Sequence, residues 1–179
     1  MALDLPEPAR AALARWRDEA VAGRDDLRAV APNALHVTLA FLGYRPQKEI
    51  PLIAQVAAEA VEGLPPARLV PAGVKPVPPR RPRLFALDLE EPAGECTAVQ
   101  SAISEALAGR RLYRPEKRPF WPHVTLARVK RGLRAEPLRT EPPAAEELLA
   151  DRVTLYRSTL LPQGARYDPL ESVTLPVSR

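Results

Sequence analysis

The sequence predicts an α+β fold built from two similar halves, because two of its segments recur at nearly the same spacing. The pentapeptide HVTLA occurs at residues 36–40 and again at 123–127. The segment ALDLPEPARAALARW, from Ala2, is echoed by ALDLEEPAGECTAVQ, from Ala86. The ALDL copies are 84 residues apart (86 − 2), and the two HVTLA histidines are 87 apart (123 − 36). A repeat this regular predicts a duplicated β-α-β unit.

Helix-like and strand-like segments alternate along each half, without the long apolar runs that are typical of parallel sheets. We therefore predict a bilobal fold with an antiparallel sheet in each lobe, the two sheets facing a central cleft and the helices lying outside. Residues 1–179 are expected to form a single domain of this kind, with the repeated motifs at 36–39 and 123–126 in corresponding places.

In the first half, residues 8–22 and 48–62 carry apolar side chains at helical spacing and predict two helices. Residues 64–82 are rich in proline, which removes backbone donors, so we expect a short strand at 68–70 and edge or loop structure elsewhere. The first ALDL begins almost at Met1, whereas PRLF precedes the second. We therefore expect the natural start to lie a few residues upstream.

In the second half, residues 83–89 predict a strand, and residues 97–108 predict a helix closed by Gly109. Residues 141–150 predict a short helix. The chain then ends in two strand-like runs joined by a turn at Gln163–Gly164.

The composition indicates a soluble cytoplasmic protein, which we expect to be a monomer. Hydrophobic residues make up 46% of the chain and charged residues 27%. No apolar run approaches the ~20 residues needed to cross a bilayer. Cys96 is the single cysteine, so no internal disulfide forms, as is usual in a reducing compartment. It lies in a predicted amphipathic helix, and we expect a buried thiol rather than a nucleophile.

Basic residues are concentrated in one stretch of the chain. The net charge is +4, yet residues 110–134 contain nine basic side chains and one acid, a local net charge of +8 (9 − 1). The rest of the chain therefore sums to −4. Such a stretch either suits a partner that carries phosphates, as RNA does, or forms an ordinary solvated face.

His36 and His123 are the only histidines in the chain, and each begins an HVTLA segment. Successive side chains of a strand point to opposite faces. The valine and leucine of each motif then anchor its strand in the core. His36 and Thr38, like His123 and Thr125, face the space between the lobes. If an approximate two-fold axis relates the halves, one His–Thr pair confronts the other.

Two opposed imidazoles suit an in-line displacement at phosphorus. A neutral imidazole accepts a proton from an attacking water, and a protonated imidazole donates one to a leaving ribose oxygen. Histidine, with a pKa of about 6.5, supplies both forms near neutral pH. The threonine hydroxyls can donate hydrogen bonds to the non-bridging oxygens. A strained cyclic phosphate needs no metal for this reaction, and we expect no cofactor.

Motifs for other kinds of catalysis are missing from the sequence. Catalytic zinc usually takes three protein ligands, and the chain has two histidines and one remote cysteine. The sequence contains no HExxH or CxxC metal motif, no GxxxxGK[ST] nucleotide loop and no GxSxG nucleophile elbow.

The segments LHVTLAFLG and RPFWPHVTLARV resemble the paired HxTx motifs of the 2H phosphoesterases, and more closely those of the RNA 2',3'-cyclic phosphodiesterases, also called 2'-5' RNA ligases. The resemblance runs from ALDLP near the start to the closing LYRSTLLPQGARYDPLESVTLP. It implies a bilobal α+β fold. It also implies metal-independent hydrolysis of an RNA 2',3'-cyclic phosphate end to a 2'-phosphate, with reversible 2'-5' ligation as a secondary activity.

The resemblance also implies roles for the four motif residues. His36 would be the proton donor and His123 the acceptor, with Thr38 and Thr125 holding the phosphate. The pseudo-symmetry of the sequence does not by itself decide which histidine has which role.

Trp121 and Arg128 are further candidates for substrate binding. Trp121 lies two residues before His123 and shares its face, so it either stacks on a base or packs in the cleft wall. Strand alternation places Arg128 with Val124, away from the threonines, unless a bulge turns it. It is then a member of a structural ion pair or, if turned, a phosphate ligand. Phe41 is expected in the core.

Two alternatives to this function remain open. A non-catalytic RNA-binding protein would use the basic stretch at residues 110–134 on a duplicated scaffold. A related phosphodiesterase would act instead on 2'-5' oligoadenylate or on small cyclic nucleotides, because the motifs recognise the phosphate and not its substituents.

Overall fold

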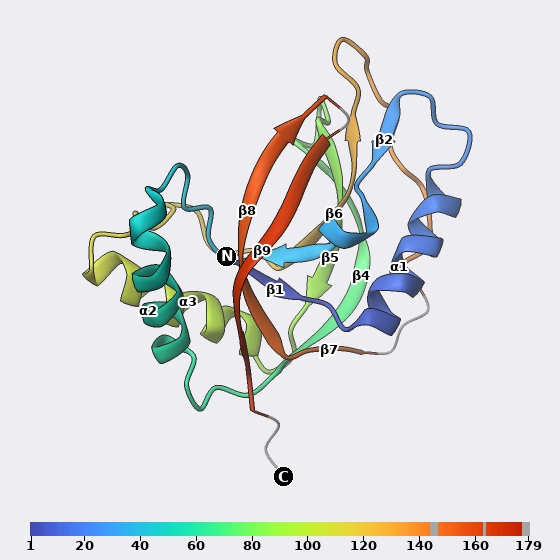
Figure 1. Ribbon diagram of the computed structural model, residues 1–179. Helices are drawn as coiled ribbons and strands as arrows, with labels where there is room; N and C mark the ends of the chain where they lie inside the picture. Colours follow the sequence, from blue (N-terminus) through green and yellow to red (C-terminus); the bar gives the residue numbers. More distant parts are fainter. Residues whose placement is uncertain (144–146, 163, 177–179) are drawn as a thin grey trace.

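Nine antiparallel strands form one curled sheet, in the order β7-β4-β5-β6-β3-β1-β8-β9, with β2 also paired to β6. The computed structural model describes residues 1–143, 147–162 and 164–176. The strands are β1 (Ala2–Asp4), β2 (Leu27–Ala29), β3 (His36–Thr38), β4 (Ala67–Val77), β5 (Leu84–Glu90), β6 (His123–Val129), β7 (Leu148–Ala150), β8 (Arg152–Leu161) and β9 (Gly164–Thr174). Figure 1 shows them curling into a half-barrel.

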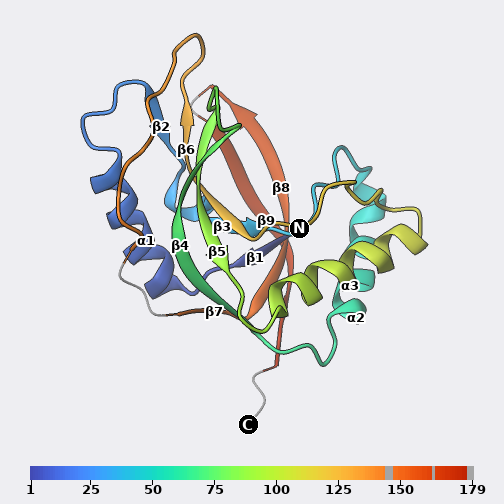
Figure 2. The same ribbon diagram turned by 180° about the vertical axis from the view of Figure 1, so that it is seen from behind.

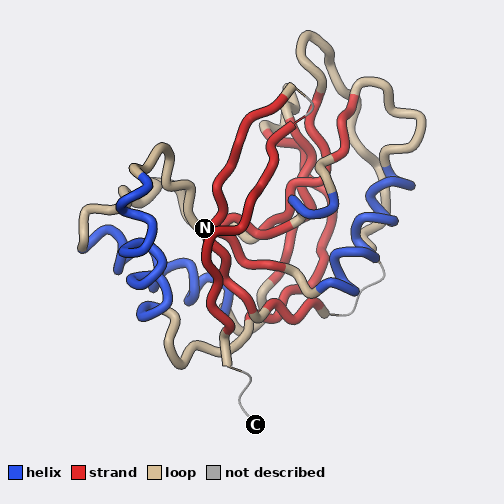
Figure 3. The backbone as a smooth tube through the Cα atoms, viewed as in Figure 1, coloured by secondary structure: helices blue, strands red, loops and turns tan. Residues whose placement is uncertain are grey.

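Among the described residues, three α-helices flank this sheet. They are α1 (Glu7–Ala20), α2 (Ile50–Ala60) and α3 (Glu95–Gly109), and short 3-10 turns lie at Pro32–Ala34 and Gln47–Glu49. In Figures 1 and 2, α1 lies on one side of the strands, and α2 and α3 lie together on the other. Figure 3 shows the strands between these two groups of helices. In the part of the chain that the structure describes, no helix has the length and apolar character needed to cross a membrane.

The sheet has the two-fold character that the repeat predicts. On one side of the centre lie β6, β5 and β4, and on the other lie β3, β1 and β8, so that corresponding strands of the two halves occupy mirrored places. The predicted α+β class with antiparallel strands is therefore confirmed. The structure adds that the two halves meet edge to edge, because β3 pairs with β6 through Val37 and Val124.

The core lies between the helices and one face of the sheet. Leu3 and Val37 from the first half, and Leu87 and Val124 from the second, have no exposed surface. Each is flanked in its strand by residues that point to the other face. That alternation leaves the inner face of the half-barrel to the polar members of the motifs.

The strand expected at 68–70 is longer than predicted, because β4 continues from Ala67 to Val77, and of the edge or loop structure expected beyond it the structure has the edge. β7 covers only Ala67–Leu69, so beyond Leu69 this strand lies at an edge that needs no further donors. A register shift between Pro71 and Gly73 accommodates Pro71, the first proline within β4.

Two local predictions were wrong. Gly109 does not close α3 with a left-handed turn. It remains helical, and Arg111 takes the positive φ of 58° instead. The helix expected at 141–150 is contradicted at its end, where Leu148–Ala150 pairs with β4 as a strand. Residues 144–146 lie outside the described part of the chain.

Candidate active site

The pairing of Val37 with Val124 brings the two HVT segments side by side. In an antiparallel pair the numbers of opposing residues have a constant sum, here 161 (37 + 124). His36 is therefore opposite Thr125 (36 + 125), and Thr38 is opposite His123 (38 + 123). Directly opposed residues share a face of the sheet, and diagonal neighbours such as the two histidines are roughly 7–8 Å apart, with their Cβ atoms somewhat closer. That spacing can hold a phosphate group between the two rings.

The neighbouring strands extend this arrangement into two antiparallel rows. β1 pairs with β3 so that Asp4 is opposite His36 and Ala2 is opposite Thr38. β5 pairs with β6 so that Asp88 is opposite His123 and Ala86 is opposite Thr125. Read across the four strands β5, β6, β3 and β1, the residues on this face form two rows. Each row contains one alanine, one threonine, one histidine and one aspartate, in that order from β5 in the first row and from β1 in the second. The rows are Ala86, Thr125, His36, Asp4 and Ala2, Thr38, His123, Asp88.

His36 lies among aromatic rings with little access to solvent. Only 9% of the residue is exposed. Its ring stacks on Tyr156 at a centroid distance of 5.5 Å and meets the edge of Tyr167 at 4.9 Å. Burial, and after it the charge of the N-terminal ammonium, lowers the pKa of His36 to about 4. Its Nδ1 atom is buried and has no hydrogen-bond partner among the described residues. In the free protein, His36 is therefore neutral at pH 7.

His123 is more accessible and is held by Trp121 in two ways. The indole ring stacks on the imidazole at a centroid distance of 4.2 Å, with 18° between the ring planes. The Nδ1 atom of His123 lies 2.7 Å from the backbone carbonyl oxygen of Trp121. A carbonyl oxygen only accepts hydrogen bonds, so this Nδ1 carries the hydrogen. In the neutral ring, Nε2 on the far side then has a free lone pair.

Asp4 and Asp88 are functional candidates that the sequence reasoning missed. Asp4 accepts hydrogen bonds from the hydroxyls of Thr154, at 2.6 Å, and Tyr156, at 2.9 Å. Asp88 accepts from Nε1 of Trp121 and pairs with Lys75. Each aspartate is the third residue of an ALDL segment, so the repeat already contained the signal that would have found them.

The carboxylate of Asp88 is charged in the folded protein. Burial acts to raise its pKa, but the hydrogen bonds from Lys75 and Trp121 outweigh burial, and the net pKa lies below the ordinary value. Trp121 is thus fixed at its Nε1 by Asp88, while one face of its ring covers His123. Of the two alternatives for Trp121, packing against the site is the contact present in this structure.

Arg128 does not lie with Val124 as strand alternation predicted. A bulge between Phe85 and Ala86 makes Leu126 and Ala127 both point into the core. The alternation is thereby inverted, and Arg128 returns to the face of His123 and Thr125, where it is exposed. Among the described residues it forms no ion pair.

Phe41 was expected in the core, and this prediction was wrong. The side chain follows the end of β3 and is 73% exposed, and Tyr44 in the same loop is 92% exposed. Alternation could not place Phe41, because β3 ends at Thr38 and the chain leaves the sheet there.

Cys96, in contrast, is buried as predicted, and burial raises the pKa of its thiol to about 12.

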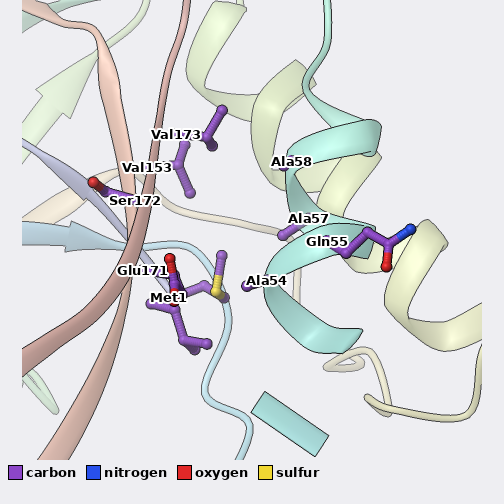
Figure 4. Close-up of a pocket in the computed structure, with 10 residues that line it drawn as sticks. Met1, Ala54, Gln55, Ala57, Ala58, Val153, Glu171, Ser172 and Val173 are labelled. Atoms are coloured by element: carbon purple, nitrogen blue, oxygen red, sulfur yellow. The ribbon is translucent and has the colours of Figure 1, made fainter. Parts of the chain in front are cut away.

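A cavity of about 220 Å³ lies away from the histidines, between α2 and the ends of β8 and β9 (Figure 4). Its lining is mostly apolar, and Glu171 is the one charged side chain among the residues that line it. A carboxylate repels a phosphate, so this cavity does not suit the chemistry of the motifs.

Within the described residues, no three His, Cys, Asp or Glu side chains gather as they would around a metal ion.

Comparison with known proteins identifies the family. The sequence matches the 2'-5' RNA ligase superfamily over residues 5–160. A Thermus thermophilus relative named RNA 2',3'-cyclic phosphodiesterase is 31% identical over 180 residues, which cover 97% of this chain and 88% of the relative. A Geobacillus stearothermophilus relative of the same name is 30% identical over 165 residues, which cover 89% of this chain. The chain spans about half the length of that second relative, 52%.

Solved structures agree with this assignment. The crystal structure of the Thermus thermophilus protein TT0787 is 30% identical, covers 99% of this chain and 97% of its own, and superimposes with a TM-score of 0.78. E. coli LigT complexed with 3'-AMP is 27% identical, covers 97% of this chain and 95% of its own, and has a TM-score of 0.79. The chain belongs to the 2'-5' RNA ligase superfamily of 2H phosphoesterases, as the paired motifs predicted.

Proposed function

We propose that this protein hydrolyses the 2',3'-cyclic phosphate at an RNA end to a 2'-phosphomonoester, with His36 and His123 as the acid and the base and without a metal. The observation that carries the proposal is the pair of opposed rows, in which each histidine is opposite the threonine of the other motif. The family and the names of the relatives support the same enzyme class.

The proposed reaction is a single in-line displacement at phosphorus. A water molecule loses a proton to one imidazole as its oxygen bonds to phosphorus. The bond from phosphorus to the ribose O3' breaks, and that oxygen takes a proton from the other imidazole. Thr38 and Thr125 donate hydrogen bonds to the non-bridging oxygens, where negative charge develops. The two histidines end with their protonation states exchanged.

The surroundings of the two rings support His123 as the proton acceptor. Its Nδ1 hydrogen is bound to the Trp121 carbonyl, which leaves the lone pair of Nε2 free. An orphaned buried N–H is rarer in proteins than an orphaned acceptor. Neutral His36, whose Nδ1 has no partner among the described residues, therefore carries its hydrogen on Nε2. The Nε2 atom of His36, on the opposite side of the ring from the buried Nδ1, can therefore donate a hydrogen bond.

Substrate binding must complete the protonation of His36 for this assignment to work. In the free protein its pKa is about 4, because burial disfavours the cation. A phosphate anion between the rows stabilises an imidazolium beside it, and so raises the pKa. Proton uptake by His36 is therefore coupled to binding of the substrate.

The decisive experiment is incubation with an RNA oligonucleotide that ends in a 2',3'-cyclic phosphate, followed by determination of the phosphate position. The expected product carries a 2'-phosphate. A 3'-phosphate, or an unchanged cyclic end, contradicts the proposal. Salt-sensitive RNA binding that produces no product in any condition would instead favour the non-catalytic alternative. Turnover of 2'-5' oligoadenylate, with cyclic ends left intact, would favour the related phosphodiesterase.

The direction of proton transfer needs a separate test with an activated leaving group. A nucleoside p-nitrophenyl phosphate diester releases p-nitrophenolate, which leaves without protonation. We expect His36→Ala to lose far less activity on this diester than on the cyclic phosphate, whereas His123→Ala loses activity on both. The opposite pattern would exchange the two roles.

Reversible 2'-5' ligation, the same steps run backwards, is tested by incubating the 2',3'-cyclic end with a 5'-hydroxyl RNA.

A further inference from the structure

Lys75 lies on the active-site face of the sheet because of an irregularity in β4. The register between β4 and β5 shifts between Pro71 and Gly73, and beyond the shift Lys75 is opposite Ala86. Ala86 is in turn opposite Thr125 on β6. Opposed residues share a face, so the lysine belongs to the same face as the motif threonine. Without the shift, the preceding residue of β4 would take this place and the lysine would point to the other face.

The ammonium of Lys75 contacts the two groups that border His123. It pairs with Oδ2 of Asp88, while Oδ1 of the same carboxylate accepts the hydrogen bond from Nε1 of Trp121. The ammonium also lies 5.7 Å from the centroid of the indole ring, a distance at which a cation and an aromatic ring attract each other. The imidazole of His123 stacks on that same indole. Lys75 is therefore linked to His123 through both Asp88 and Trp121.

Asp88 is the carboxylate that faces His123. The two residues are opposite each other where β5 pairs with β6, and 16% of the Asp88 side chain is exposed. A carboxylate so close to an imidazole favours the protonated ring, because opposite charges attract. An imidazole must be neutral before it can act as a general base. Without a compensating charge, Asp88 would therefore oppose the role proposed for His123.

Lys75 provides that compensating charge. Among the described residues of the neighbouring strands, the charged or titratable side chains that face His123 are Asp88 on β5, Lys75 on β4 and His36, its diagonal neighbour on β3. On its own strand, exposed Arg128 shares the face. Lys75 is the cation that pairs with Asp88, and the two charges of the pair sum to zero. The pair as a unit therefore favours the imidazolium much less than a lone carboxylate would.

The equivalent aspartate of the first half has different partners. Asp4, opposite His36, accepts hydrogen bonds from the hydroxyls of Thr154 and Tyr156. It belongs to none of the ion pairs found in the described residues. Its negative charge is thus left to stabilise an imidazolium at His36, the proposed proton donor. The halves differ in the sense that the reaction requires, with a cation beside one aspartate and neutral hydroxyls beside the other.

We propose that Lys75 is a positioning residue that keeps His123 ready to accept a proton. It does so by neutralising Asp88 while it holds that carboxylate against Trp121. This inference rests on the proposed function. The carboxylate then orients the indole, and through it the imidazole, without holding a proton on that ring before the water molecule is attacked. A lysine suits this position, because its compact ammonium can pair with one carboxylate oxygen and leave the other to Trp121.

The test measures kcat/KM on an RNA 2',3'-cyclic phosphate as a function of pH. Lys75→Met keeps a long side chain beside the indole but removes the charge, so that Asp88 then favours the protonated form of His123. We expect the acid limb of the profile to move to higher pH by roughly 0.5 to 1 unit. This is less than a fully buried charge would cause, because 55% of the Lys75 side chain is exposed. At higher pH the activity of the variant should recover.

Three further variants show whether the charge of Lys75 is responsible. Lys75→Arg keeps the charge and should retain the wild-type profile, whereas a shift equal to that of Lys75→Met would overturn the inference. Lys48→Met, in the exposed turn Gln47–Glu49, is the matched control and should leave the profile unchanged. In an Asp88→Asn background the carboxylate charge is absent, so Lys75→Met should lose most of its effect. An undiminished shift in that background would overturn the route through Asp88.

NMR titration of His123 separates this inference from the proposed function, because it needs no turnover. The midpoint of the titration should lie at higher pH in Lys75→Met than in the wild-type protein. An unchanged midpoint, or an equal loss of activity at every pH, overturns the inference even if the cyclic end is hydrolysed. If the midpoint moves and the cyclic end is left intact by the wild-type protein, the proposed function fails and the effect of Lys75 on His123 stands. A thermal unfolding curve of each variant shows that it is folded.

Discussion

Val37 and Val124 face each other across β3 and β6, and both are fully buried. This one backbone pairing determines which residues of the two motifs are neighbours on the opposite face. It places each histidine beside the threonine of the other half, so the two imidazoles are diagonal to each other rather than directly opposed. A phosphate bound there contacts groups from both halves at once.

Removal of either imidazole should reduce catalysis strongly. We expect His36→Ala and His123→Ala each to lower kcat at least ~100-fold on an RNA 2',3'-cyclic phosphate, since each loses one general acid–base group. Steady-state kinetics measures the effect, and a thermal unfolding curve of each variant shows that it remains folded. Full activity in both folded variants would disprove the roles assigned to the histidines.

Chelation of divalent ions should leave the reaction unaffected. The proposed displacement uses two imidazoles and two hydroxyls, and none of its steps needs a Lewis acid. Activity on the cyclic phosphate is therefore expected to be the same before and after dialysis against EDTA. An enzyme that is silenced by EDTA and restored by a divalent metal would show that the mechanism is incomplete.

Burial of His36 predicts a loss of stability in mild acid. Its pKa is about 4 in the folded protein and about 6.5 in an unfolded chain. As the pH falls below 6.5, the unfolded state takes up a proton that the folded state does not bind until about pH 4. The stabilisation is thus fully present above pH 6.5 and is lost as the pH approaches 4, by about 3 kcal/mol in total.

Urea unfolding at a series of pH values measures this effect. His36→Asn is the matched control, because it keeps a polar side chain at the position and removes the titrating group. The free energy of unfolding of the wild-type protein should fall more steeply between pH 6.5 and 4 than that of the variant. Parallel curves would show that His36 is not protected from protonation.

Anion binding between the rows should be coupled to proton uptake by His36. An anion raises the pKa of His36 from about 4, so affinity should increase as the pH is lowered from 8 to 5. Sulfate is a suitable probe, because its own charge is constant over that range. NMR titration of the two histidines, with and without sulfate, measures the shift directly. A His36 pKa that does not rise with sulfate would place the anion elsewhere.

The link from Asp88 through Trp121 to His123 should contribute to kcat more than to KM. Trp121→Phe keeps an aromatic ring against His123 but loses the hydrogen bond to Asp88, and Asp88→Asn weakens the same bond from the other side. We expect each change to lower kcat by about tenfold, as for the loss of one charge-assisted hydrogen bond. If the two variants together lose the product of the single effects, the residues do not act as one unit.

The repeat and strand alternation together predicted much of the candidate site. Two copies of HVTLA were enough to place His36, Thr38, His123 and Thr125 on the faces of their strands opposite the buried valine and leucine. They could not give the register between β3 and β6, because pairing between segments 87 residues apart depends on the whole fold. The place of Asp4 beside His36 depends on a different register, the one between β1 and β3.

The errors have local physical causes. Alternation failed for Arg128 because a bulge in β6 inserts one extra buried residue, and no residue type in the motif marks it. It failed for Phe41 because the strand ends three residues earlier. The prolines of β4 left edge and loop structure open, and the structure has the edge, with a register shift between Pro71 and Gly73. The fold of residues 1–179 as one functional domain and the roles of the site residues remain predictions.

An approximate two-fold axis relates the halves, yet the two histidines have different surroundings. In a dimer of identical half-size chains, symmetry would surround both rings with the same side chains. Joined in a single polypeptide, the equivalent positions are free to diverge, so that Tyr156 and Tyr167 shield one imidazole while Trp121 orients the other. Because the halves are joined in one chain, the two imidazoles can have different surroundings, as the proposed acid and base roles require.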